Sequence, residues 1–154
     1  IHFDSYFFPL DRINNWNRLY GSHGFLQYQF VIPTETAKIG IGEVMNQVTA
    51  SGKGSFLSVL KKFGAANKNY LSFPTDGYTL ALDFKFEKSL LPLLNKLDEI
   101  ILHHGGRLYL AKDARMSEHT FKQGYTHWDK FLSVKNELDP DGVFSSLQSK
   151  RLGL

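Results

Sequence analysis

Apolar and polar positions alternate along several stretches of this chain, as they do in strands with one buried face. The apolar positions of the first stretch are Leu26, Tyr28, Phe30 and Ile32, and those of a later one are Tyr78, Leu80, Leu82, Phe84 and Phe86. The pattern predicts strands over residues 24–33, 55–63 and 78–86, and a short fourth strand over residues 107–110.

Two stretches between these strands have the three- to four-residue spacing of amphipathic helices. Their apolar stripes are Ile41, Val44, Met45 and Val48 after Thr34, and Leu90, Leu94, Leu97 and Ile101 after Ser89. We expect Ser89 to cap the second helix and Gly105-Gly106 to end it. Residues 1–9 are predicted to be extended and residues 11–20 to form a short helix.

The order strand, helix, strand, strand, helix, strand predicts an α+β fold. It is the order of a ferredoxin-like antiparallel sheet (βαββαβ) with both helices on one face. We expect a lead-in over residues 1–24, the sheet domain over residues 25–110 and a helical tail over residues 111–154. Because the tail falls outside this motif and the chain starts without Met, we expect a piece of a longer protein.

The sheet face away from the helices is predicted to be mixed and mostly polar. Its residues are Gln27, Gln29, Lys61, Phe63, Thr79, Ala81 and Asp83. Lys112 follows the fourth strand directly, among Tyr109, Asp113 and Arg115. Amides, a cation and an aromatic ring suit a polyhydroxylated or phosphorylated ligand. A solvated sheet face and a solvated lysine are the open alternative.

Composition narrows the class of protein. The 154 residues suit one compact domain, the formal charge is only +3, and there is no Cys. Disulfides and thiolate metal sites are therefore excluded, and the cytoplasm is favoured. No apolar run approaches the roughly 20 residues of a transmembrane helix, so we expect no transmembrane segment.

Familiar catalytic motifs are not found. The six His residues lack metal-ligand spacing, so no metal is expected. There is no dinucleotide or P-loop motif and no nucleophile elbow. Asp98 and Glu99 are predicted to lie on a helix surface, which leaves no paired carboxylates for acid–base chemistry.

RNA-recognition modules share this strand and helix order, and the sequence pI is about 9.1. A non-enzymatic binding module of that type is the alternative hypothesis. Such modules stack bases on aromatic side chains of the third strand, whereas here the positions are Thr79, Ala81 and Asp83. We therefore expect no nucleic-acid partner.

Four long segments carry a resemblance to a known family. They are residues 7–35, FFPLDRINNWNRLYGSHGFLQYQFVIPTE; residues 49–64, TASGKGSFLSVLKKFG; residues 71–84, LSFPTDGYTLALDF; and residues 105–115, GGRLYLAKDAR. Together they resemble the C-terminal part of FAD-linked oxidoreductases of the vanillyl-alcohol-oxidase type. Within that family the similarity is to the branch that oxidises a polyprenyl-phosphoryl ribose.

The resemblance implies FAD, bound mainly by an N-terminal domain of the same polypeptide outside this chain. Residues 25–110 would then form a substrate-binding cap, with the tail returning to the flavin domain. It implies oxidation of a sugar hydroxyl, free or lipid-linked, by hydride transfer to flavin. Lys112 matches the family's lysine beside flavin and substrate, and Tyr109 lies next to it.

Substrate-pocket positions are also implied. Gln29 and Lys61 match polar pocket residues, and Phe63 matches an aromatic wall. Phe7, Thr79 and Ala81 stand where the family has tyrosine, asparagine and cysteine, so the exact sugar is expected to differ. The resemblance also implies a parent protein in the cytoplasm, at a membrane or on its periplasmic face.

Overall fold

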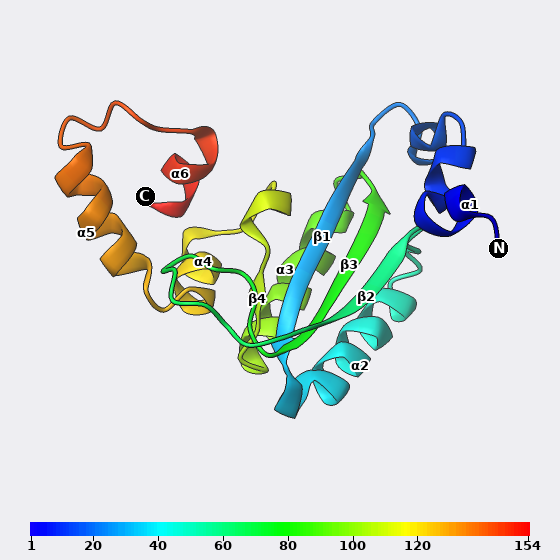
Figure 1. Cartoon of the computed structure of the whole chain (residues 1–154), viewed down its shortest axis with the longest axis horizontal. Coiled ribbons are helices and arrows are strands. Elements are labelled where there is room, and N and C mark those ends of the chain that lie inside the picture. The colour runs from blue at the N-terminus through cyan, green and yellow to red at the C-terminus, as the bar shows by residue number, and fades with distance from the viewer.

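The structure is a computed structural model that describes residues 1–154, except for the side chain of Arg12. Its centre is a four-stranded sheet in the order β2-β3-β1-β4, with every neighbouring pair antiparallel. The strands are β1 (Phe25–Pro33), β2 (Ser58–Phe63), β3 (Gly77–Lys85) and β4 (Arg107–Leu108). Helices α2 (Thr34–Ala50) and α3 (Leu90–His103) pack on one face (Figure 1). The predicted α+β class is confirmed.

Alternation along the strands builds the core as predicted. Apolar side chains from β1, β3 and α3 are buried together: Tyr28, Phe30, Ile32, Leu80, Leu82, Phe84, Leu90, Leu94, Leu97 and Ile101. The stripe of α2 was predicted less well, because it buries Ala37 and Gly40 while Met45 is exposed. A Cβ on Gly40 would lie only 2.8 Å from the Ile32 side chain, so the glycine allows this close approach.

The lead-in differs from its prediction. Residues 3–7 form α1 (Phe3–Phe7), where an extended chain was expected, because His2 Nδ1 caps the helix by accepting the Asp4 N–H. The single helix expected over residues 11–20 is two 3₁₀ turns, η1 (Pro9–Arg12) and η2 (Trp16–Tyr20), separated by Asn15 in a left-handed conformation.

Two strands are shorter than predicted. β2 begins at Ser58 instead of residue 55, because Ser55 Oγ and the Leu57 carbonyl both accept the Asp83 N–H in place of a regular ladder. β4 ends at Leu108. One further bond joins Tyr109 N to Gln29 O (2.8 Å), and the chain then turns into η3 (Leu110–Lys112).

Ser89 stands at the N-cap position of α3 as predicted, but its hydroxyl accepts a hydrogen bond from Lys53 Nζ at 3.0 Å and makes no cap bond to the helix. The predicted end of that helix is correct. Gly105 has a φ of +72°, and a Cβ on Gly106 would lie 2.4 Å from the Val31 carbonyl oxygen. Glycines at these two positions let the chain reverse and pair with β1 at once.

The tail forms α4 (Glu118–Gly124), α5 (Trp128–Leu138) and α6 (Leu147–Leu152). Ser117 caps α4, and the buried Tyr125 hydroxyl donates to the Leu108 carbonyl at 2.6 Å. Figure 1 shows α4 beside α3 and β4, with α5 and α6 farther from the sheet. Within the described part of the chain, no helix is long and apolar enough to cross a membrane.

Candidate functional site

Strand register places the predicted polar residues on one sheet face. Gln27 stands opposite Asp83, and Gln29 stands opposite Ala81. Thr79 is paired with Lys61 on its other side. Gln29 Nε2 donates to Thr79 Oγ1 at 3.1 Å. The predicted membership of this face is confirmed, because cross-strand partners point to the same side of a sheet.

This face is less open to solvent than the sequence suggested. Thr79 is 1% exposed. At one end the loop over residues 64–76 folds across the sheet, and Phe73 stacks on Tyr109 with centroids 4.4 Å apart. Phe63 meets Phe73 edge to face at 5.7 Å, and Arg107 Nη1 donates to the Ser72 carbonyl at 3.1 Å. Side chains of a long loop, and no helix, provide this cover.

At the other end of the face lies a cavity of about 350 Å³, and the lead-in forms most of its wall. The wall is apolar and comes from Leu10, Ile13, Trp16, Leu19, Phe25, Phe56 and Leu57. The polar lining consists of Tyr20, Gln27, Asp83 and Lys112. An apolar enclosure with a few convergent polar groups is the usual form of a small-molecule site.

Asp83 is the centre of the polar lining, although it is only 3% exposed. Its Oδ1 accepts from Gln27 Nε2 at 2.7 Å, and its Oδ2 accepts from the Tyr20 hydroxyl at 3.3 Å. Burial, together with the Asp83 charge, raises the pKa of Tyr20, so the hydroxyl stays protonated and donates. Sequence reasoning put Asp83 on this face but missed the cluster, because only folding brings Tyr20 to it.

Lys112 lies on η3 at the edge of the cavity, with its side chain exposed. It also borders a narrow adjoining cleft of about 20 Å³, lined in part by Gln27, Gln29 and Tyr109. The predicted association of Lys112 with the polar face is therefore seen in the geometry. Its ammonium group can present a fixed positive charge to a ligand in the cavity.

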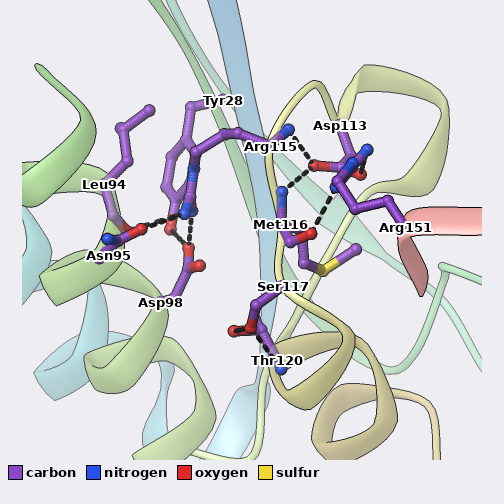
Figure 2. A network of polar contacts seen from close by, with 10 residues as sticks. All are labelled: Tyr28, Leu94, Asn95, Asp98, Asp113, Arg115, Met116, Ser117, Thr120 and Arg151. Carbon is purple, nitrogen blue, oxygen red and sulfur yellow. Dashed lines mark hydrogen bonds and ion pairs between the residues drawn. The ribbon is translucent and has the colours of Figure 1, made fainter. Parts of the chain in front are cut away.

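The segment after Lys112 is held by a buried network (Figure 2). Arg115 forms an ion pair with Asp98 and donates to Asn95 Oδ1 at 2.6 Å. The Tyr28 hydroxyl donates to Asp98 Oδ1 at 2.7 Å, and burial together with Asp98 raises the Tyr28 pKa well above its ordinary value. The prediction that Asp98 lies on a helix surface is wrong, because its partner Arg115 comes from a distant loop. Glu99 is exposed, as expected.

The structure brings the remaining predicted residues together only in part. Phe63 and Tyr109 share the aromatic cluster around Phe73. Lys61 is on the same face but exposed on β2. Phe7 is 59% exposed in α1, where its ring contacts Phe3 and Tyr6. Across the described residues, no group of three or more His, Cys, Asp or Glu side chains could hold a metal ion.

Comparison with known proteins identifies the family. Residues 30–152 match the D-arabinono-1,4-lactone oxidase family, and the chain belongs to it. The similarity to FAD-linked oxidoreductases predicted from the sequence is thereby confirmed.

Similarity to individual proteins is consistent with this family. The chain is 43% identical, over 97% of its length, to the decaprenylphosphoryl-β-D-ribose oxidase of Mycolicibacterium smegmatis, of which it covers 32%. It is 34% identical, over 72% of its length, to a protein of Streptomyces coelicolor described as uncharacterized, of which it covers 30%. It is 23% identical, over 83% of its length, to an L-gulono-1,4-lactone dehydrogenase of Mycobacterium tuberculosis, of which it covers 30%. The chain thus spans about a third of the length of these relatives.

Proposed function

We propose that this chain is the substrate-binding and cap part of an FAD-dependent oxidoreductase that oxidises a sugar hydroxyl by hydride transfer to flavin. The observation that carries the proposal is the cavity that Lys112 shares with Gln27 and Asp83. Family membership supports it, as do the names of two of the relatives, which refer to a ribose and to a sugar lactone.

Under this proposal, FAD would be bound mainly by another domain of the same polypeptide and would supply the hydride acceptor. Lys112 is the catalytic residue contributed by this chain, and Tyr109 lies beside the cofactor. A fixed ammonium group stabilises negative charge that develops on the reacting partners, without any reorganisation at the moment of reaction. Exposure of the Lys112 side chain at the cavity edge leaves it accessible to a cofactor from outside the chain.

The substrate would bind over the helix-free face. Gln29, Lys61 and Ala81 contribute its polar and small positions, and Phe63 contributes an aromatic wall. Thr79, which is buried, belongs to this site by holding Gln29 through its hydroxyl. Asp83 and Gln27 add an acceptor and an amide that suit sugar hydroxyls. Phe7 is assigned to this group by its match to the family's pocket position, and its ring lies in α1 against Phe3 and Tyr6.

A lipid-linked sugar, such as a polyprenyl-phosphoryl sugar, is the finer substrate proposal. Its support is the apolar wall of the cavity, which continues into the exposed apolar side chains of residues 1–24. Phe3 and Tyr6 are 61% and 68% exposed, so this segment presents aromatic side chains to solvent. Exposed apolar patches of this kind mark interaction surfaces. Such a segment suits a membrane surface, on the cytoplasmic or the periplasmic side, where a lipid-linked substrate is found.

We further infer the ferredoxin-like form of the sheet domain, with divisions at residues 1–24, 25–110 and 111–154. The support is the element order βαββαβ, in which β1 and β3 are central and β2 and β4 are the edges. This order does not support the RNA-recognition alternative. The third-strand residues on the helix-free face are Thr79, Ala81 and Asp83, and none is an aromatic residue on which a base could stack.

The test is anaerobic reduction of the bound flavin by a sugar substrate in the complete protein. We expect a yellow protein whose flavin is bleached by substrate. Lys112→Ala should slow bleaching by about 100-fold or more with the fold retained, as expected for loss of a transition-state charge partner. Lys130→Ala, on the exposed side of α5, is the matched control. A colourless complete protein, or wild-type bleaching by Lys112→Ala, would refute the proposal.

A further inference from the structure

Asp113, the residue directly after Lys112, is almost completely enclosed, with a side chain only 2% exposed. Its Oδ1 accepts the backbone N–H groups of Arg115 at 2.9 Å and Met116 at 2.6 Å, which sets the shape of the loop. Its Oδ2 accepts from Arg151 Nη2 at 2.8 Å and from Gln148 Nε2 at 3.2 Å. The carboxylate therefore joins the Lys112 loop to a helix 35 residues farther along the chain.

The α6 side chains of Gln148 and Arg151 also form hydrogen bonds with backbone carbonyls at both ends of this loop. Gln148 Nε2 donates to the Leu110 carbonyl at 2.7 Å, just before Lys112. Arg151 Nη1 donates to the Met116 carbonyl beyond it, and Figure 2 shows Arg151 between Asp113 and Met116. Residues 110–116 are thus held at their start, middle and end.

α6 is itself well anchored. A capping box between Ser146 and Ser149 starts the helix, and Leu152 is 1% exposed within the main core cluster. On the opposite side of the loop, Arg115 donates to the Leu94 carbonyl of α3 at 3.3 Å. The loop backbone is held between α3 and α6, and Lys112 borders the cavity.

We propose that Gln148 and Arg151 are positioning residues for Lys112, which they hold in place through Asp113 and the carbonyls at either end of the loop. The inference rests on the catalytic role proposed for Lys112. A lysine side chain is long and flexible, so the location of its charge depends on how firmly its backbone is held. A displacement of about 1 Å in an active site can cost about 100-fold in rate.

Gln148→Ala is the informative variant because it changes no charge. In the complete, flavin-loaded protein we expect kcat for flavin reduction to fall by about 10-fold or more with KM nearly unchanged. We also expect a lower midpoint potential of the flavin, because a displaced cation stabilises the reduced form less. Gln123→Ala, at an exposed position of α4, is the matched control and should show neither effect.

Arg151→Lys is the second variant. It keeps the positive charge but cannot bridge Asp113 and Met116 with two nitrogens of a rigid fork. It should lower kcat in the same way, and backbone amide exchange at Arg115 and Met116 should accelerate in both variants. This exchange readout does not depend on turnover.

The outcomes are distinguishable. If Lys112→Ala reduces flavin at the wild-type rate, the proposed function fails and this inference fails with it. If Lys112→Ala is slow but Gln148→Ala and Arg151→Lys keep the wild-type kcat and potential, the positioning role alone is refuted. A uniform loss of stability in both variants, with unchanged kcat and potential in the folded fraction, would show a purely structural role and also refute it.

Discussion

Replacing Asp98 with leucine should be among the most destabilising single changes in this protein. The carboxylate is a shared partner of Arg115 and the Tyr28 hydroxyl, and its side chain is only 5% exposed. Its removal leaves the Arg115 side chain, which is only 14% exposed, facing an apolar leucine. It also leaves the buried Tyr28 hydroxyl without its acceptor.

Breaking a buried ion pair by deleting one partner costs about 3–5 kcal/mol. Arg115 keeps its bonds to Asn95 Oδ1 and the Leu94 carbonyl, which favours the lower half of that range. The Tyr28 hydroxyl adds about 1 kcal/mol or more, since an orphaned buried donor keeps its full desolvation penalty. We therefore expect a loss of about 4 kcal/mol in the free energy of unfolding.

The assay is urea unfolding followed by circular dichroism, compared at an unchanged m-value. The set comprises Asp98→Leu, Arg115→Met and the double variant, with Glu99→Leu at the neighbouring exposed position as the control. The double variant should cost less than Asp98→Leu alone, because it leaves no unpaired charge. A loss below about 1 kcal/mol for Asp98→Leu, or costs that simply add in the double variant, would refute this account of the network.

Two further predictions use other parts of the structure. Gly106→Ala should destabilise the protein by about 1–3 kcal/mol, because its Cβ would lie 2.4 Å from the Val31 carbonyl oxygen. Gly42→Ala, in open space on α2, should instead stabilise it by up to about 1 kcal/mol. Thermal unfolding of the two variants measures both changes, and changes of the same sign would contradict the reasoning. Burial opposes ionisation of Asp113, but the hydrogen bonds it receives, from Arg151 first, hold its pKa below the ordinary value. Its contribution to stability should therefore be complete above about pH 4 and disappear as pH falls through that lowered pKa, so the unfolding free energies of wild type and Asp113→Asn should converge in acid. A gap between them that persists unchanged to pH 2 would exclude this linkage.

Local pattern in the sequence determined most of the sheet domain. The alternation at Tyr28, Phe30 and Ile32 assigned β1 and its buried face, and the stripe from Leu90 to Ile101 assigned α3. These positions were predictable because a strand or helix with one buried face repeats its apolar residues at its own period, and that repeat is visible in the local sequence alone. The membership of the helix-free face followed from the same alternation.

The irregular parts could not be predicted in this way. The form of residues 3–20 depends on a cap from His2 and a left-handed Asn15, and β2 is shortened by Ser55 bonding to β3. Each is a side-chain to backbone contact with no periodic signal.

The candidate site was likewise predictable from the sequence only in part. The sequence by itself determined that Lys112 follows the last strand and that Gln27, Gln29 and Asp83 share one face. Only the tertiary structure decided that Tyr20 closes on Asp83, that Asp98 is buried under Arg115, and that Gln148 and Arg151 hold the Lys112 loop. The physical reason is that these contacts join residues 17 to 63 positions apart. Their energy depends on burial, which exists only once the elements have packed.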